Sequence, residues 1–267
     1  MCSSLLHKER ILTTICVIGD MQIRPDMNLD HIEHIGRYIS DKRPDVIVQI
    51  GDWWDMPSLC SYDRGKASFE GRRVKEDIEA GHDGMRRLME PIRKLQQSQR
   101  YFKKKVYNPR FVLTWGNHDE RLDRAARDNP ELVGFISTKE LKAEQYGWEV
   151  YEFLKPINIE GINFVHYLAN PMTGRPYSGS AVGMLKTVGA SFVMGHKQVL
   201  DIAIRTTLEG KNQIGIINGA SYPHFEDYKG HQGGNNHFRG ITMLYEAKDG
   251  FALPSFISLD FLKEKYS

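Results

Sequence analysis

The chain has 267 residues, 40% of them hydrophobic and 26% charged, which is the composition of a globular protein long enough to bury a full core. Basic and acidic residues nearly balance at a net charge of +2, and no apolar run approaches the roughly 20 residues of a membrane-spanning helix, so we expect no membrane partner. The three cysteines, at positions 2, 16 and 60, lack the spacing of metal or redox motifs. They argue against a disulfide framework and favour a reducing, cytoplasmic location.

The first 50 residues alternate apolar strands with an amphipathic helix. The run "TTICVI" (13–18) follows a basic cluster, and we interpret it as a first core strand rather than as part of a signal peptide. "NLDHIEHIGRYISDKR" (28–43) has helical periodicity, and "DVIVQI" (45–50) is a second apolar strand. A strand, a helix and a strand in this order predict a parallel sheet flanked by helices.

The segment 60–105 is predicted to be a basic, mostly helical excursion. Apolar residues recur along it at intervals of three, four or seven, and Pro91 predicts a kink or a break between two helices. From Arg64 to Lys105 there are 13 basic and 6 acidic residues, an excess of seven positive charges. Such a segment could bind a polyanion, or it could be the solvated face of a long helix.

The rest of the chain is predicted to be mainly β-structure. After a strand at "RFVLTW" (110–115), short helices are expected at 120–128 and 138–146. From about residue 147, short strands alternate with glycine-containing turns. We therefore expect a single domain over residues 1–267, in which two sheets pack together with helices outside.

Five apolar strands end in, or carry, side chains that can bind a metal ion. These side chains are Asp20, Asp52, Asn117 followed by His118 and Asp119, His166, and His196. Ligands of α/β proteins gather at the carboxyl ends of the strands, so we expect these groups to converge. One histidine at the end of a strand is more often structural than a metal ligand, but five such strands together indicate a metal centre.

The order of these motifs resembles that of the calcineurin-like metallophosphoesterase superfamily. The pattern of that family is Asp-x-His, Gly-Asp, Gly-Asn-His-Asp/Glu, a lone histidine and Gly-His-x-His. Here "DMQ", "GD", "GNHD", His166 and "GHKQ" follow in that order over about residues 15–200. The resemblance implies a four-layer α/β/β/α fold with two mixed β-sheets flanked by helices. Around "GDWWDMPSL" and "FEGRR" the sequence is also similar to phage-encoded proteins, which suggests a phage-type member of the family.

The resemblance implies a two-metal site in which Asp52 bridges the ions. The implied metal ligands are Asp20, Gln22, Asp52 and Gln198 at one site, and Asp52, Asn117, His166 and His196 at the other. The sequence departs from the family at Gln22 and Gln198, where histidine is usual, so that one of the two sites has only oxygen donors. Oxygen donors favour hard ions. We therefore expect Mn²⁺, with Mg²⁺, Fe, Ni²⁺ or Zn²⁺ as alternatives at the site that contains histidine.

Three residues are candidates for catalysis in the implied mechanism. His118 would protonate the leaving alkoxide and Asp119 would hold His118 in orientation. Arg121, three residues beyond His118, could reach a phosphate oxygen. The alternatives are that His118 packs against the site at the start of a helix and that Arg121 forms a surface salt bridge.

Residues near the metal motifs bear on the substrate. Trp53, Trp54 and Tyr62 could stack on a base, although tryptophans beside a strand are more often core or lid residues. His224, His237 and Arg239 belong to a glycine- and histidine-rich loop at about 221–240. This loop could close over a ligand as a rim, or it could be a surface loop with incidental histidines.

Together these features predict a metal-dependent phosphodiesterase whose substrate is a nucleotide or a nucleic acid. A phosphomonoesterase acting on nucleotides or proteins is the alternative, because the metal core serves both reactions. A non-catalytic metal-binding scaffold is a third interpretation, since two usual histidines are replaced at one metal site. The oligomeric state is left open by the sequence.

Overall fold

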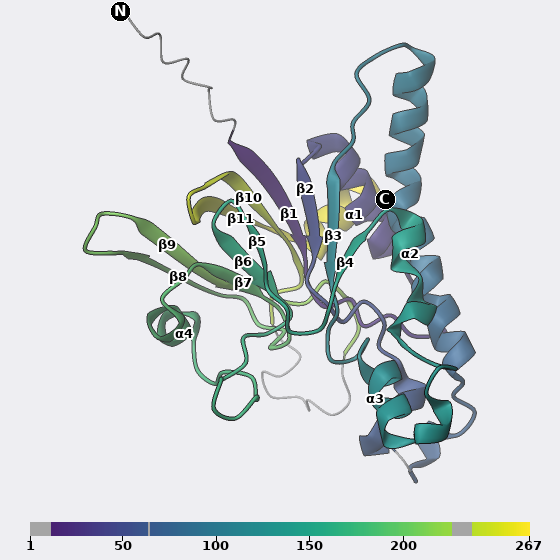
Figure 1. Cartoon of the computed structure of the whole chain (residues 1–267). Helices are drawn as coiled ribbons and strands as arrows, with labels where there is room; N and C mark the ends of the chain where they lie inside the picture. Colours follow the sequence, from purple (N-terminus) through teal and green to yellow (C-terminus); the bar gives the residue numbers. More distant parts are fainter. Residues whose placement is uncertain (1–11, 64, 226–236) are drawn as a thin grey trace, which may run out of the picture.

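Two mixed β-sheets pack face to face in the computed structural model, which describes residues 12–63, 65–225 and 237–267 (Figure 1). The first sheet has the order β11-β10-β1-β2-β3-β4. Its strands are β1 (Thr13–Ile18), β2 (Val46–Gln49), β3 (Arg110–Thr114), β4 (Glu149–Tyr151), β10 (Gly240–Lys248) and β11 (Phe251–Ser258). The second sheet has the order β5-β6-β7-β9-β8. Its strands are β5 (Ile157–Ile159), β6 (Ile162–Val165), β7 (Phe192–Met194), β8 (Asp201–Thr206) and β9 (Asn212–Ile217).

Helices cover the outer faces of the two sheets. The α-helices are α1 (Asp30–Lys42), α2 (Val74–Tyr101), α3 (Arg121–Asp128), α4 (Ala181–Val188) and α5 (Leu259–Tyr266). Helices α1 and α2 share one apolar cluster with the first sheet, and α4 packs on β8 and β9 of the second (Figure 1). The expected fold, two mixed sheets flanked by helices, is confirmed.

Strand β1 shows how the sequence produces two apolar cores. Ile15 and Val17 belong to the cluster between the two sheets, whereas Cys16 and Ile18 belong to the cluster beneath the helices. All four side chains are fully buried. Successive side chains of a strand point to opposite faces, so a strand covered on both faces is apolar throughout. The end of β1 is therefore held in the middle of the fold.

The parallel strands bring the predicted metal-binding motifs to one edge of the fold. β1 is parallel to β2, with Ile18 opposite Gln49, and β2 is parallel to β3, with Gln49 opposite Leu113. In the second sheet β6 is parallel to β7, with Val165 opposite Met194. Each motif follows the last residues of its strand, so the motif loops leave the sheets at their carboxyl ends, where ligands bind in α/β proteins.

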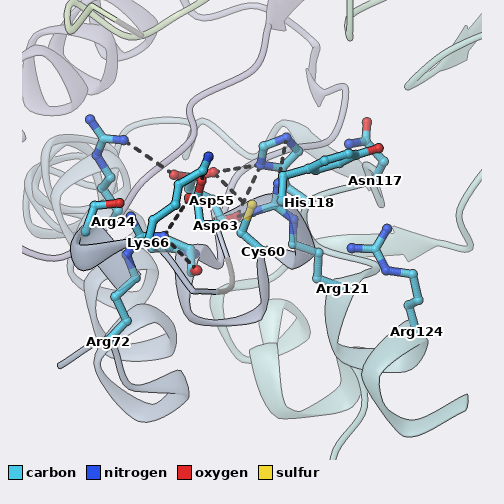
Figure 2. Close-up of a pocket in the computed structure, with 13 residues that line it drawn as sticks. Arg24, Asp55, Cys60, Asp63, Lys66, Arg72, Asn117, His118, Arg121 and Arg124 are labelled. Atoms are coloured by element: carbon cyan, nitrogen blue, oxygen red, sulfur yellow. Dashed lines mark hydrogen bonds and ion pairs between the residues drawn. The ribbon is translucent and has the colours of Figure 1, made fainter. Parts of the chain in front are cut away.

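The segment expected as a helical excursion contains three short 3-10 helices and one long α-helix. The short helices are η1 (Pro57–Leu59), η2 (Ser61–Asp63) and η3 (Ala67–Phe69). Residues of all three line a cavity together with Asn117 and His118 (Figure 2). Helix α2 runs for 28 residues with Pro91 inside it, so Pro91 does not divide the segment into two helices.

Short helices are also present after β3, as expected. Helix α3 corresponds to the prediction at 120–128, and the segment 138–146 forms two 3-10 helices rather than one α-helix. The 3-10 helices of this region are η4 (Pro130–Leu132), η5 (Thr138–Leu141) and η6 (Ala143–Tyr146). Within the described ranges, no helix is both long and apolar enough to span a membrane.

Trp53 and Trp54 attach α2 to the loop that follows β2. Both side chains are fully buried. Trp53 Nε1 donates to the carbonyl oxygen of Gly81 at 3.0 Å, and Trp54 Nε1 donates to that of Ile78 at 3.2 Å. The structure corrects the expectation that these rings stack on a substrate base, because neither ring is open to a ligand. Both are core residues, which was the alternative.

Gly81→Ala is expected to destabilise the protein, because a β-carbon at Gly81 would lie 1.8 Å from Trp54 Nε1. The clash should lower the free energy of unfolding by about 1–3 kcal/mol, measured by chemical denaturation followed through tryptophan fluorescence. The control is Gly183→Ala in α4, where the β-carbon would meet only Ser180 Oγ, at 3.9 Å. That variant should gain about 0.5–1 kcal/mol from helix propensity. Equal effects of the two variants would contradict the packing described for Trp54.

Candidate metal centre and catalytic site

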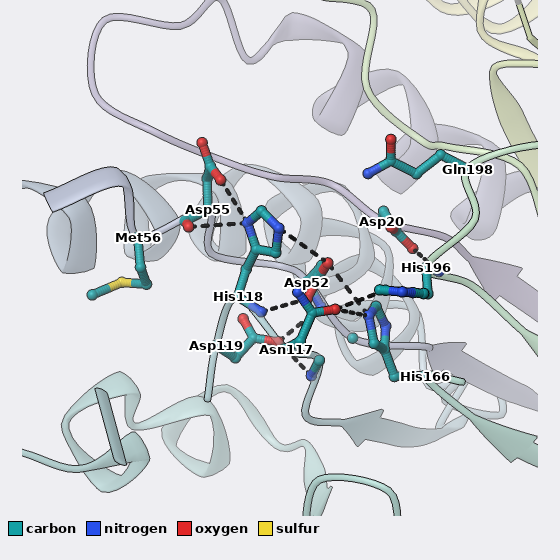
Figure 3. Close-up of polar contacts among 12 residues, drawn as sticks. Asp20, Asp52, Asp55, Met56, Asn117, His118, Asp119, His166, His196 and Gln198 are labelled. Carbon is teal, nitrogen blue, oxygen red and sulfur yellow. Dashed lines mark hydrogen bonds and ion pairs between the residues drawn. The ribbon is translucent and has the colours of Figure 1, made fainter. Parts of the chain in front are cut away.

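The loops at the carboxyl ends of five strands bring the expected metal ligands together (Figure 3). They are Asp20 after β1, Asp52 after β2, Asn117 after β3, His166 after β6, and His196 and Gln198 after β7. The seventh expected ligand, Gln22, also follows β1, where its backbone N–H donates to the carbonyl oxygen of Asp52 at 2.8 Å. Four of these seven residues have φ in the left-handed region, between 44° and 65°. Residues other than glycine adopt this conformation at a cost, and they do so most often in functional sites.

Asp52, His166 and His196 form one half of the centre. Each offers a ligand atom, and the three atoms lie within 4.8 Å of one another. Asn117 adds its Oδ1, at 2.9 Å from His166 Nε2 and 2.8 Å from His196 Nδ1. These four side chains are the ones that the sequence analysis assigned to the histidine-containing site.

His166 is oriented for metal binding by the backbone of Ile50. Its Nδ1 lies 2.9 Å from the carbonyl oxygen of Ile50, and since a carbonyl oxygen only accepts, Nδ1 is the donor. Burial opposes protonation of His166, but the charges of Asp52 and Asp20 outweigh burial and raise its pKa to about 9, so that Nε2 carries a proton and donates to Asn117 Oδ1. A divalent ion would take the place of this proton, as in other sites where a backbone carbonyl orients a ligand histidine. The residues of this half fit a divalent metal ion.

Asp20 and Gln198 belong to the other half of the centre. Asp20 Oδ1 accepts from the backbone N–H of His196 at 3.0 Å, while its Oδ2 is buried with no hydrogen-bond partner among the described residues. Gln198 Oε1 accepts from the Tyr222 hydroxyl at 2.9 Å, and the Gln198 side chain acts to lower the pKa of the Asp20 carboxyl group. Gln22 Nε2 is also buried without a partner in the described ranges. The orphaned carboxylate oxygen fits a cation, but the Gln198 oxygen is turned towards Tyr222.

The charges of the centre favour a cation between its carboxylates. Burial raises the pKa of Asp20 to about 6, the charge of His166 opposes this rise, and Asp52 adds to it. Burial also disfavours ionisation of Asp52, but the nearby His166 and His118 outweigh burial and hold its pKa well below its usual range. Two buried carboxyl groups in one site repel each other when both are ionised. A bound cation removes this repulsion.

His118 points towards the metal centre and is oriented by Asp55. His118 Nε2 lies 3.8 Å from Asp52 Oδ2, and its Nδ1 lies 2.7 Å from Asp55 Oδ1. Burial opposes protonation of the ring, but the charges of Asp52 and Asp55 outweigh burial and raise the pKa of His118. A histidine with one nitrogen on a carboxylate and the other facing the reaction centre is suited to donate a proton. The sequence analysis missed Asp55, although "GDWWD" places it three residues after Asp52.

Asp119 does not orient His118 as the sequence analysis expected. Its carboxylate accepts three backbone N–H groups instead, from Asp52 and Gly116 at 2.8 Å and from Trp54 at 2.9 Å. Burial, followed by the charge of Asp52, raises the pKa of Asp119 to about 7. The Asp119 carboxylate does not orient His118 because both of its oxygens already accept N–H groups from the loop after β2. Asp119 therefore fixes the position of Asp52.

Arg121 holds the same loop from its other side. Its Nη1 donates to the carbonyl oxygens of Asp55 at 2.6 Å and Met56 at 3.2 Å, and lies 3.6 Å from Asp55 Oδ1. Its Nη2 lies 3.4 Å from His118 Nε2. The sequence analysis expected Arg121 either on a phosphate oxygen or in a salt bridge. In this structure it pairs with Asp55 beside His118.

A family model described as "Calcineurin-like phosphoesterase" matches residues 13–248. The chain belongs to this family. Its members are hydrolases of phosphate esters, and they typically bind two divalent metal ions. The recognition from the sequence motifs is confirmed, and with it the assignment as a metallophosphoesterase.

The Gene 54 proteins of two mycobacteriophages are similar to this calcineurin-like phosphoesterase. That of Mycobacterium phage L5 is 28% identical over 204 residues, which cover 74% of this chain and 74% of the phage protein. That of Mycobacterium phage D29 is 30% identical over 122 residues, or 45% of this chain and 42% of the phage protein. One solved structure covers 93% of this chain and 100% of its own at 10% identity, but its TM-score of 0.42 supports no conclusion.

In this calcineurin-like phosphoesterase, other residues of the 221–240 loop pack around Tyr222. The His224 ring stacks on Tyr222 with centroids 4.1 Å apart, and the His237 ring is 6.4 Å away. Arg239 Nη1 donates to the carbonyl oxygens of Tyr222 at 2.7 Å and of His224. These three predicted substrate-binding residues thus support the tyrosine that binds Gln198. The remainder of the predicted rim loop, 226–236, lies outside the described residues.

A basic cavity of about 840 Å³ opens beside His118 (Figure 2). Its charged lining residues are Arg24, Lys66, Arg72, Arg121 and Arg124 with Asp55 and Asp63. Lys66 and Arg72 come from the segment that was predicted to be a basic excursion. On α2 itself, by contrast, Arg87 and Lys94 pair with acids one turn earlier, as on an ordinary solvated helix face.

Asp55→Asn is expected to lower kcat for phosphate-ester hydrolysis by about 10- to 100-fold, because His118 loses the carboxylate that orients and charges its ring. Metal content, measured by elemental analysis, should stay that of the wild type, since Asp55 is not among the metal-binding side chains. The control is Asp83→Asn, which removes an exposed carboxylate from α2. Loss of metal together with activity in Asp55→Asn would show that Asp55 acts on the metal centre instead.

Proposed function

We propose that this calcineurin-like phosphoesterase is a metal-dependent phosphodiesterase that acts on a nucleotide or a nucleic acid. The observation that carries the proposal is the cavity of about 840 Å³ next to His118, whose lining has three more basic than acidic side chains. Cavities of this size hold drug-sized ligands such as a nucleotide. An excess of positive charge favours a substrate with several negative charges.

Two divalent ions would be held by the expected ligands Asp20, Gln22, Asp52, Asn117, His166, His196 and Gln198. When bound, they supply Lewis-acid polarisation of the phosphoryl group and acidify a water molecule near neutral pH. We propose Mn²⁺ as the ion of the Asp20 half, because its donors are carboxylate and carboxamide oxygens. A half-turn of the Gln198 amide would direct its oxygen to that half and leave its nitrogen to donate to Tyr222, whose hydroxyl can also accept.

His118 is the general acid of the proposed reaction. Its Nε2 faces the centre and would transfer a proton to the leaving oxygen, while Asp55 accepts the hydrogen bond of Nδ1–H and stabilises the charged ring. Asp52 and Asp55 raise the pKa of His118, and the positive charge of the neighbouring Arg121 guanidinium offsets part of this rise. The offset favours release of the proton. An alkoxide leaving group needs such an acid.

The substrate class is tested with bis(p-nitrophenyl) phosphate, p-nitrophenyl phosphate and the dinucleotide TpT, each with Mn²⁺, Mg²⁺, Zn²⁺ and Ni²⁺. We expect kcat/KM for the two diesters to exceed that for the monoester by tenfold or more, with Mn²⁺ the best ion. A preference for the monoester would replace the proposal with a phosphomonoesterase. Absence of turnover with every ion would favour a metal-binding scaffold.

His118→Ala is the matched control for this screen. It should lower kcat/KM for TpT by about 100- to 10,000-fold, because the departing alkoxide loses its proton donor. The effect on bis(p-nitrophenyl) phosphate should be much smaller, since nitrophenolate leaves without protonation. Equal losses on both substrates would contradict the role of His118 as the acid.

The metal assignment predicts two unequal sites in calorimetric titrations of the metal-free protein. Mn²⁺ should bind tightly at the half that contains His166 and more weakly at the Asp20 half. Replacing both glutamines, as Gln22→His with Gln198→His, should tighten binding of the second Zn²⁺ by tenfold or more, because zinc prefers imidazole to carboxamide. Two equally tight zinc ions in the wild-type protein would contradict the assignment.

A further inference from the structure

The cavity beside His118 is separate from the metal-binding side chains except at Asn117. It starts at Asn117 and His118 and extends under the loop that carries η1, η2 and η3, and neither His166 nor His196 lines it. Figure 2 shows Arg24 and Arg124 on opposite sides of His118. The two arginines come from different elements, since Arg24 follows β1 and Arg124 lies in the middle of α3. The cavity therefore adjoins the metal centre on its His118 side.

Most of the charges that line the cavity are paired with one another. Asp63 accepts from Lys66 and from Arg72, both at 2.8 Å. Asp55 lies 3.6 Å from Arg121 and 3.8 Å from Arg24. Two carboxylates are thus paired with four cationic side chains. This part of the wall is a basic surface with a surplus of positive charge.

Arg124 is the exception in the lining. Among the residues that the structure describes, its guanidinium has no hydrogen bond and no ion pair, although it lies at the cavity wall. Its neighbour on the same helix, Arg127, is paired with Glu120 at 2.7 Å and is not a lining residue. A guanidinium offers a planar pair of donors that matches a phosphate group. Arg124 is therefore positioned to bind an anion that enters the cavity.

We infer that this cavity binds a second phosphate group of the substrate, one that is carried by the leaving group. The inference rests on the proposed function, because His118 marks the leaving-group side only if it is the general acid. Under that assignment, the product that departs past His118 enters a cavity whose wall is cationic. Arg124 binds the phosphate of that product directly, and Arg24 adds positive charge from the opposite side.

The inference narrows the substrate to a nucleotide derivative with a phosphate beyond the scissile bond. Both a phosphorylated dinucleotide and an internal position of a nucleic-acid strand have this chemistry. Tyr62 lines the cavity with a side chain that is 84% exposed, so its ring is open to the base of the leaving nucleoside. Of the three aromatic residues that the sequence analysis considered for stacking, Tyr62 is exposed, whereas Trp53 and Trp54 are buried.

The test compares the dinucleotide TpT with pTpT and TpTp, in which a terminal phosphate is added on one side or the other. With Mn²⁺, one of the two phosphorylated forms should have a kcat/KM about tenfold above that of TpT, as expected for a charge-assisted contact. In Arg124→Ala this ratio should fall to about one. In Arg127→Ala, the matched loss of an arginine from the same helix, the ratio should stay at the wild-type value. An unchanged ratio in Arg124→Ala, or no preference in the wild type, overturns the inference.

A longer strand distinguishes the two sources of the phosphate. If decathymidylate has a kcat/KM no higher than that of the preferred phosphorylated dinucleotide, the cavity holds one terminal phosphate. A further rise in kcat/KM shows that the binding surface continues along a strand.

Binding of thymidine 3′,5′-bisphosphate to the metal-free protein, measured by calorimetry against thymidine, gives a readout without turnover. If the bisphosphate binds to Arg127→Ala but not to Arg124→Ala, the proposal that the cavity binds a phosphate is supported even if no diester is hydrolysed. Bisphosphate binding no tighter than that of thymidine would overturn the inference, even if diesters are hydrolysed.

Discussion

The carboxylate of Asp119 holds together the two loops on which the site depends. It accepts N–H groups from Asp52 and Trp54 in the loop after β2 and from Gly116 in the loop after β3. This fixes Asp52 in a left-handed conformation, with its Oδ1 accepting from the His118 amide. The approach is so close that a β-carbon at Gly116 would lie 2.1 Å from Asp52 Oδ1. The pattern Gly-Asn-His-Asp thus combines a close backbone approach, a proposed metal ligand, the proposed general acid and an anchor in four consecutive residues.

The same loop connects the metal centre to the cavity. Trp53 and Trp54 bury their rings against α2, and two residues further on Asp55 and Met56 accept hydrogen bonds from Arg121. A rigid loop between these anchors keeps Asp55 on His118, since a carboxylate orients a histidine only if it is itself held in place. The chain then continues into the short helices that form the cavity wall. His118 and the cationic surface are therefore positioned by one continuous segment.

The predictions that depended on local pattern and those that depended on packing had different outcomes. The strand ends with Asp20, Asp52, Asn117, His166 and His196 were found from the sequence, because parallel strands must present their carboxyl ends at one edge. The roles of Asp119 and of the two tryptophans could not be found from the sequence. A carboxylate or an indole has the same neighbours in the sequence whether its side chain faces a ligand or a buried backbone group. Asp55 was overlooked for the same reason. Its role depends on the neighbouring loop that supplies His118.

The sequence by itself determined the family, the two-sheet architecture and the set of metal-competent side chains. These follow from the periodicity of the strands and from motifs that stay intact within a few residues of chain. Only the tertiary structure decided which carboxylate orients His118, that Tyr222 binds Gln198, and that Arg124 stands at a cavity with no partner among the described residues. Each of these involves elements far apart in the sequence. Their contacts are set by how the loops pack over the ends of the sheets, for which a single sequence contains no local signal.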